Sequence, residues 1–170
     1  MKLLISLLFS SMLFIQVNAQ NDEHDHEDHK HEGHNHSHHH GTKNELGFAL
    51  GPVYNALETE WAPGVHLHYV RFVSEKFGFG GGFETILDEH QHITASLAIA
   101  YSPINRLTFV FAPGLTSEAD DFPEVRFTSH FELSYEFDIK DDIHLGPLLE
   151  AALGKGDQHY MIGLHLGFGF

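Results

Sequence analysis

Residues 160–170 alternate strictly between large apolar side chains and smaller or more polar ones. The large apolar set is Tyr160, Ile162, Leu164, Leu166, Phe168 and Phe170. The positions between them hold Met161, Gly163, His165, Gly167 and Gly169. Because successive side chains of an extended strand point to opposite faces, this pattern predicts a strand with one broad apolar face. Such a face must be covered by a hydrophobic core or by lipid.

The same alternation recurs from residue 44 onward, between short breaks rich in turn-forming residues. Residues 125–138 show it clearly, because apolar side chains such as Phe131 share one parity and polar ones such as His130 share the other. No long helical periodicity is present, so the pattern favours an all-β fold. We predict eight strands, at residues 45–54, 64–73, 76–87, 91–101, 106–113, 125–138, 143–153 and 159–170.

The terminal strand, whose apolar face ends on Phe170, resembles the last strand of bacterial outer-membrane β-barrels, which typically closes on an aromatic residue read by the assembly machinery. The resemblance covers about residues 44–170 and rests on this strand together with the number and length of the others. It implies an eight-stranded antiparallel transmembrane β-barrel in the outer membrane, in contact with lipid. A soluble β-domain, with the same apolar face turned inward, is the alternative.

Two further patterns favour the membrane barrel. Predicted breaks alternate between short ones, such as residues 74–75 and 139–141, and longer ones, such as 55–63 and 113–124; outer-membrane barrels likewise have short periplasmic turns and longer outer loops. With both termini in the periplasm, many aromatic side chains fall near periplasmic strand ends, where an interfacial girdle is expected. They are Tyr69, Phe77, Phe79, Tyr101, Phe109, Tyr135, Phe137, Phe168 and Phe170.

Residues 1–19 have the features of a secretory signal peptide: a positive charge at Lys2, a short apolar core and a small residue, Ala19, before the expected cleavage point. An uncleaved anchor is the alternative, although the apolar core is short for one. No other stretch has the length of a transmembrane helix, so a membrane span must be built from strands. The sequence has no cysteine, which excludes disulfides and cysteine-based metal sites.

Residues 20–44 differ abruptly in composition and separate the signal peptide at 1–19 from the barrel at 45–170. The segment is rich in histidine, aspartate and glutamate and offers almost nothing apolar to bury, so we expect it to be disordered without a ligand. We call it the arm. Nine of the 17 histidines lie in it, at His24, His26, His29, His31, His34, His36, His38, His39 and His40.

Histidines at this density predict metal binding. Neutral imidazole is a good ligand for zinc, nickel, copper and cobalt, and a flexible chain can fold several imidazoles around one ion. The interleaved carboxylates attract cations and can fill the remaining coordination positions. The segment enforces no geometry, so it does not select one metal. A solvated acidic tail or an expression tag is the alternative.

In the barrel, the parity opposite to the apolar one predicts which side chains point inside. A turn around Lys140 would pair Glu136 with His144 and His130 with Glu150, and the turn at residues 74–75 would bring His66 near Glu84. Two interpretations remain open: structural pairs that satisfy a polar interior, and an internal metal path. The predicted interior set is His66, His68, Glu84, His92, Arg126, His130, Glu132, Glu136, His144, Glu150 and His165.

The formal net charge is −15 with histidine neutral, which disfavours nucleic acid as a partner and favours cations. We expect no enzymatic activity. The most suggestive cluster is Ser129 and His130 with Glu132 or Ser134, but neighbouring residues of a strand point to opposite faces, so Ser129 and His130 cannot meet. No Gly-x-Ser-x-Gly element is present.

The sequence therefore predicts an outer-membrane barrel that binds or buffers divalent transition metal through a periplasmic arm. Expected partners are outer-membrane lipid, the metal ions themselves and a metal transporter or efflux system that exchanges metal with the arm. Two alternatives stay open: a structural or interaction barrel without a metal role, and a soluble periplasmic metal carrier.

Overall fold

The computed structural model describes residues 42–119 and 124–170, and within these ranges every regular element is a β-strand. No helix in this part of the chain is long and apolar enough to cross a membrane. The predicted signal peptide (residues 1–19) lies outside the described residues. The predicted arm (residues 20–44) also does, except for Thr42, Lys43 and Asn44. The strands are β1 (Asn44–Asn55), β2 (Glu60–Phe72), β3 (Phe77–Ile86), β4 (His92–Ile104), β5 (Leu107–Glu118), β6 (Arg126–Tyr135), β7 (Phe137–Lys140), β8 (Ile143–Gly154) and β9 (Asp157–Gly169).

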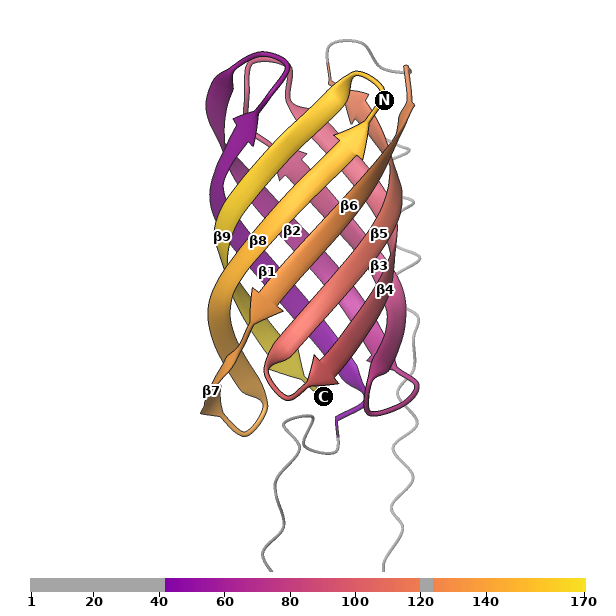
Figure 1. The fold of residues 1–170 in the computed structure, drawn as a ribbon, viewed down its shortest axis with the longest axis vertical. Coiled ribbons are helices and arrows are strands. Elements are labelled where there is room, and N and C mark those ends of the chain that lie inside the picture. The colour runs from indigo at the N-terminus through magenta and orange to yellow at the C-terminus, as the bar shows by residue number, and fades with distance from the viewer. Residues whose placement is uncertain (1–41, 120–123) are drawn as a thin grey trace, which may run out of the picture. The chain divides into compact units, whose positions relative to one another are not determined.

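All strand pairs are antiparallel, and the sheet closes on itself (Figure 1). Apart from β6 and β7, which both pair with β8, each strand pairs with its neighbour in sequence, and the pairing of β1 with β9 closes the ring. The short strand β7 continues β6 along β8, because Ser134↔Leu148 and Phe137↔Leu145 belong to one register. The fold is therefore an eight-stranded antiparallel barrel, as predicted.

The predicted sixth strand, residues 125–138, is interrupted between β6 and β7. At this point the register places Tyr135 opposite Pro147, and proline has no N–H to donate to the ladder. Gly146 beside it lets the backbones approach closely, because a Cβ there would collide with the carbonyl oxygen of Tyr135. One barrel strand is thus divided into two elements.

The apolar parity of each strand faces outward and the other faces the lumen. Large apolar side chains cover the outside, and Leu97 in mid-barrel is 70% exposed. An exterior of this kind fits the hydrocarbon core of a bilayer. Inside, side chains fill the lumen, as is usual for eight strands. Its two apolar clusters are Val70, Phe72, Ala98, Ala100, Val110 and Ala112, and Ala49, Val53, Ile86, Leu148 and Met161.

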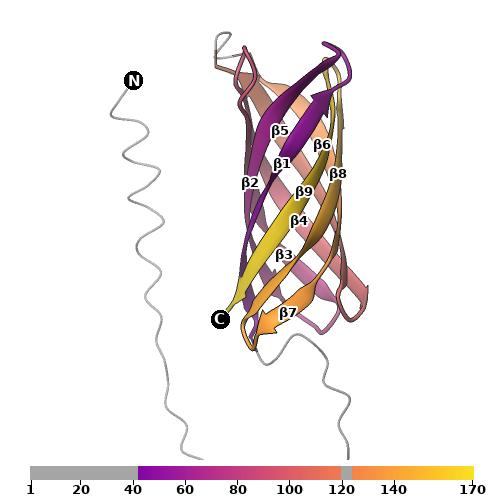
Figure 2. The same cartoon turned by 90° about the vertical axis from the view of Figure 1, so that its left-hand side faces the viewer.

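The two ends of the barrel differ in their turns (Figure 2). At the inner end, where β1 begins and β9 ends, the connections span residues 73–76, 105–106 and 141–142. At the outer end they span residues 56–59, 87–91, 119–125 and 155–156. All nine aromatic residues predicted for the inner girdle are exposed near inner strand ends.

The difference in connection length between the outer and the inner end is smaller than the sequence predicted. The break expected at 55–63 is only the four-residue connection 56–59, because β1 and β2 extend into it and pair as far as Asn55↔Glu60. The break expected at 113–124 is shortened in the same way, since β5 runs to Glu118. Proline and glycine in these stretches indicated turns, but a barrel strand can continue through them where its neighbours still supply the pairing.

Candidate metal centre

The lumen contains an unusual concentration of imidazole and carboxylate groups. Of the eight histidines after residue 41, only His90 lies outside the lumen, in the outer connection 87–91. Among the described residues no lysine or arginine is buried. We call the set the lumen column: His66, His68, His92, His130, His144, His159 and His165 with Glu45, Glu84, Glu132, Glu136, Glu150 and Asp157.

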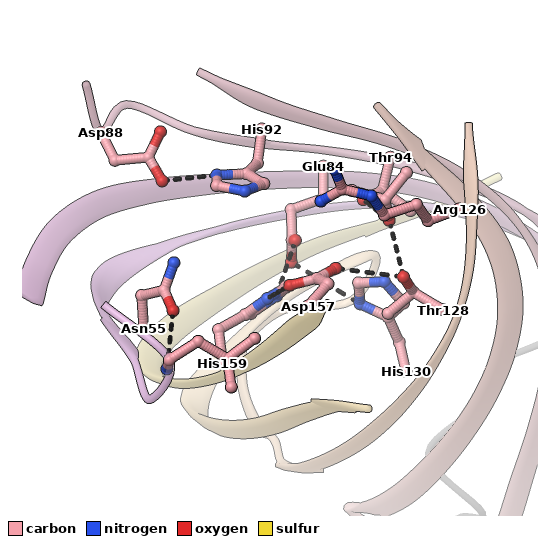
Figure 3. Close-up of polar contacts among 12 residues, drawn as sticks. Asn55, Glu84, Asp88, His92, Thr94, Arg126, Thr128, His130, Asp157 and His159 are labelled. Carbon is pink, nitrogen blue, oxygen red and sulfur yellow. Dashed lines mark hydrogen bonds and ion pairs between the residues drawn. The ribbon is translucent and has the colours of Figure 1, made fainter. Parts of the chain in front are cut away.

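The outer part of the column is a four-residue cluster. Glu84 of β3, His130 of β6, Glu150 of β8 and His159 of β9 each offer one donor atom, and these atoms lie within 4.8 Å of one another. We call them the outer cluster; Figure 3 labels Glu84, His130 and His159. His159 Nε2 lies 3.0 Å from Glu84 Oε1, and His130 Nδ1 lies 2.6 Å from Glu150 Oε1. All four side chains are buried, so the cluster is closed to solvent.

A chain of hydrogen-bonded hydroxyl groups supports the outer cluster through Asp157 (Figure 3 labels Thr94, Thr128 and Asp157). His159 Nδ1 lies 2.8 Å from Asp157 Oδ1, and the Thr128 hydroxyl donates to Asp157 Oδ2 at 3.0 Å. Thr116 donates to Thr128 at 3.0 Å and is itself 2.8 Å from the Thr94 hydroxyl. The chain crosses four strands and fixes the orientation of one imidazole ring.

The middle of the column contains His66, His68 and Glu132, whose donor atoms also form a group of potential ligands. His66 Nδ1 lies 3.4 Å from Glu132 Oε1 and 3.6 Å from Glu150 Oε2. Through Glu150 this middle cluster is therefore continuous with the outer cluster.

The inner part contains Glu45, His144 and His165, with Glu136 beside them. His144 Nε2 lies 3.5 Å from Glu136 Oε2 and 3.7 Å from Glu45 Oε1, and His165 lies 4.0 Å from Glu45. Gly167 provides the room, because a Cβ there would collide with the His144 ring. Compared with the outer cluster, this inner cluster is held by longer contacts.

The inner cluster borders a cavity of about 280 Å³ at the inner end. Turn residues around 73–76 and 102–106 line this vestibule together with Glu136 and His144. Beyond it, the lumen beside Glu45, His68 and His165 contains a space of only about 10 Å³. That is about the room needed by one water molecule. The column is consequently packed and has no open pore at this point.

At the outer end, His92 and Asp88 form an ion pair whose Nδ1–Oδ2 distance is 2.5 Å. Arg126 lies over the same rim, 2.6 Å from Glu118 and 3.3 Å from Glu124. Its side chain is 31% exposed, so the guanidinium remains at the surface and does not neutralise the buried carboxylates.

The predicted interior residues all face the lumen or its rim, and the predicted pairs meet. Glu136 lies 3.5 Å from His144, His130 lies 2.6 Å from Glu150, and His66 is the direct register partner of Glu84. The first two pairs are diagonal, because the turn is at residues 141–142 and shifts the register by two from the predicted one. An even shift leaves each side chain on its own face.

Sequence analysis missed three members of the column. His159 and Asp157 share the parity of His165 but lie at the outer limit of the last strand, where the predicted strand started. Glu45 begins the first predicted strand and shares its parity with the buried Ala49. Parity carried to the strand ends would have found all three. The nine arm histidines lie outside the described residues.

Several nitrogen and oxygen atoms of the column that could bind a metal have no hydrogen-bond partner in the structure. Buried atoms of this kind are uncommon, because an unpaired polar group in a protein interior is costly. Imidazole nitrogen combined with carboxylate oxygen is a donor set that suits zinc, nickel, copper and cobalt. The atoms include His66 Nδ1, Glu84 Oε2, His130 Nε2, His144 Nε2, Glu150 Oε2 and both ring nitrogens of His165.

Solved structures with the same fold include two bacterial proteins and a designed transmembrane barrel. Neisserial surface protein A gives a TM-score of 0.56 at 7% sequence identity, over 75% of this chain and 96% of that one. The N-terminal barrel domain of Pseudomonas aeruginosa OprF gives 0.55 at 14% identity, over 76% and 99%. A de novo designed transmembrane β-barrel gives 0.51 at 14% identity, over 72% and 94%. No protein-family model matches the sequence, and no curated protein matches it significantly.

Proposed function

We propose that the protein is an outer-membrane barrel that binds and buffers divalent transition metal through its histidine-rich arm in the periplasm. The observation that carries the proposal is the density of ligands: nine histidines within residues 24–40, interleaved with acids. The lumen column supports it, because the same two donor types recur inside the barrel without lysine or arginine to neutralise the carboxylates.

The arm and the barrel have separate tasks in this proposal. The arm offers many weak, interchangeable sites, and tethering them at one membrane keeps their local concentration high. The barrel anchors the arm, since its apolar exterior fits a bilayer and its fold is that of outer-membrane barrels. A metal transporter or efflux system is the proposed partner that takes metal from the arm or delivers it. We propose no enzymatic role.

The geometry around the candidate catalytic residues Ser129, His130 and Ser134 supports the proposal that the barrel has no enzymatic role. His130 is buried in the lumen beside Glu150, whereas Ser129 lies on the opposite face of β6. Ser134 shares the lumen face but donates its hydrogen bond to Glu136 at 2.8 Å. In this cluster, therefore, neither serine lies next to His130 at a place that a lipid substrate reaches.

Calorimetric titration of Zn²⁺, Ni²⁺ and Cu²⁺ into the purified protein tests the proposal, with and without residues 21–41. We expect several ions to bind per chain and most of that binding to vanish with the arm. A matched variant in which residues 21–41 keep their acids but have asparagine in place of each histidine separates imidazole from carboxylate ligands.

Equal binding by the intact chain and both variants would contradict the metal role of the arm. The structural or interaction barrel would then be the better account, with the acidic outer connections as its contact surface. A folded barrel recovered from the periplasm and not from the outer membrane would favour the soluble carrier. Membrane fractionation and migration on gels before and after boiling distinguish these two.

A further inference from the structure

We propose that the outer cluster is a metal site distinct from the arm, at which Glu84, His130, Glu150 and His159 bind one divalent transition-metal ion inside the barrel. The four ligands come from β3, β6, β8 and β9. In the ring of strands, β3 is three places from β6 and three from β9. A bound ion would therefore connect opposite walls of the barrel across the lumen.

The spacing of the donor atoms fits a small four-coordinate ion. With metal–ligand bonds of about 2.1 Å, tetrahedral ligands lie about 3.4 Å apart. His159 Nε2 and Glu84 Oε1 are 3.0 Å apart, and His130 Nδ1 is 3.8 Å from Glu84 Oε2. His130 Nδ1 is 2.6 Å from Glu150 Oε1. These separations bracket the required value, so side-chain adjustments of less than an ångström or so would complete the coordination.

One ligand is already oriented as metal-bound histidines usually are. A histidine that binds metal typically donates its second ring N–H to a carboxylate or carbonyl, which fixes the tautomer and the ring. His159 directs Nδ1 to Asp157 at 2.8 Å, and this leaves Nε2 facing Glu84. Asp157 in turn accepts the hydrogen bond of Thr128. In the inner cluster, by contrast, neither ring nitrogen of His165 has a hydrogen-bond partner.

The charges of the outer cluster call for a dication. Glu84 and Glu150 are both more than nine-tenths buried, and each has an Oε2 atom without a hydrogen-bond partner. Two carboxylates that are buried together and both ionised require positive charge nearby, and no described lysine or arginine is buried. One M²⁺ ion with two neutral imidazoles balances the cluster. Protons on the imidazoles or on one of the carboxylates are the competing solution, and the experiment below separates metal binding from protonation.

The packing around the cluster predicts slow exchange. Between the vestibule and the outer cluster, a space of about 10 Å³ lies beside His68 and Glu132 of the middle cluster. The outer cluster itself has no exposed member. An ion bound there should leave much more slowly than one held by the arm. The inner cluster has three ligands, longer contacts and a vestibule of about 280 Å³, so it is the poorer candidate for a resident ion.

The test uses the full protein extracted from outer membranes, with asparagine at all nine arm histidines so that the arm has no imidazole ligand. Co²⁺ is the probe, because its visible absorption reports coordination number and ligand type. We expect one Co²⁺ per chain with the intense absorption of four-coordinate cobalt, and release into a chelator over hours. H159N and E84Q should abolish the signal, and D157N should weaken binding about 10- to 100-fold.

Matched controls are H90N in the outer connection and H144N in the inner cluster, both of which should leave the signal intact. Heat-dependent gel migration verifies that each variant is folded. Absence of stoichiometric Co²⁺ from the folded barrel would overturn the proposal in favour of protonated imidazoles. Loss of binding in H144N but not in H159N would overturn it in favour of the inner cluster. Neither result would contradict the proposed metal binding by the arm, because that binding is measured separately in the unaltered chain.

Discussion

The chain carries two populations of histidine, and they differ in what surrounds them. In the arm, nine histidines stand among acids in a segment with no apolar side chain between His24 and His40. In the lumen, seven histidines are spaced along the barrel by strand register and are packed against buried carboxylates. The fold of the barrel imposes the geometry of the second population.

The difference shows that ligand type and ligand geometry are encoded separately. Arm composition predicts that transition metals bind but leaves the coordination open. In the lumen, residues far apart in sequence meet: His159 and Glu84 are 75 positions apart and lie 3.0 Å from each other. In the proposed function the arm captures many ions, and in the further proposal the lumen retains one.

The largest contrast should appear when one carboxylate is neutralised in each region. Glu150 lies 2.6 Å from His130 and 3.6 Å from His66, and E150Q removes its charge from a buried pair. We expect the free energy of unfolding in lipid vesicles to fall by about 3–5 kcal/mol. The matched arm variant E27Q should change it by less than about 0.5 kcal/mol. Equal effects in chemical denaturation would break the distinction between the regions.

An arginine on the outer face tests whether the lumen-lining strands need a bilayer. Leu97 points outward from the middle of β4 and is 70% exposed. L97R should cost about 2–4 kcal/mol in vesicles, because a charge near the bilayer midplane is poorly solvated. L57R, in the outer connection 56–59, should cost about 0–1 kcal/mol. If urea titrations give L97R no penalty, the apolar face does not contact lipid.

Acidification should weaken the arm's metal binding. Imidazole has an ordinary pKa of about 6.5, and only the neutral ring is a ligand, so affinity is full above that pKa and is lost as pH falls through it. Between pH 7.5 and 5.5 each imidazole ligand costs about 10-fold, so a two-histidine site loses about 100-fold, or about 2.7 kcal/mol. Zinc titrations at both pH values measure this. Constant affinity would assign binding to the arm's carboxylates.

The smallest expected effect comes from the hydroxyl chain behind the outer cluster. T116V removes the bonds of Thr116 to Thr94 and Thr128, at 2.8 and 3.0 Å. We expect a loss of about 1–2 kcal/mol of unfolding free energy, about 1 kcal/mol for each hydrogen bond. T85V, the same change at an outward-facing position of β3, should not destabilise the barrel. A neutral T116V would mean that Asp157 is held without these hydroxyls.

Alternation was sufficient to predict the strands and the lumen face, because a period of two survives errors in the exact ends. The pairs Glu136–His144 and His130–Glu150 were predicted from a register that is wrong by two, and they still meet because an even shift preserves the face. Strand ends and turn positions were less predictable. Pairing with neighbours extends β1, β2 and β5 through proline and glycine that indicated loops.

The grouping of the lumen side chains into clusters was beyond sequence reasoning. It depends on which strands face each other across the closed barrel, and the register between sequence neighbours does not fix that relationship. His159 and Asp157 illustrate this, since their roles appear only once β9 lies opposite β3. The signal peptide and the arm stay predictions.

The most direct test is the metal content of the protein extracted from the outer membrane of cells grown with zinc, nickel, copper and cobalt, measured by elemental mass spectrometry before and after a brief chelator wash. The account predicts several transition-metal ions per chain before the wash and one ion retained after it. A protein from the outer membrane that carries no more metal than a barrel without histidines would contradict it.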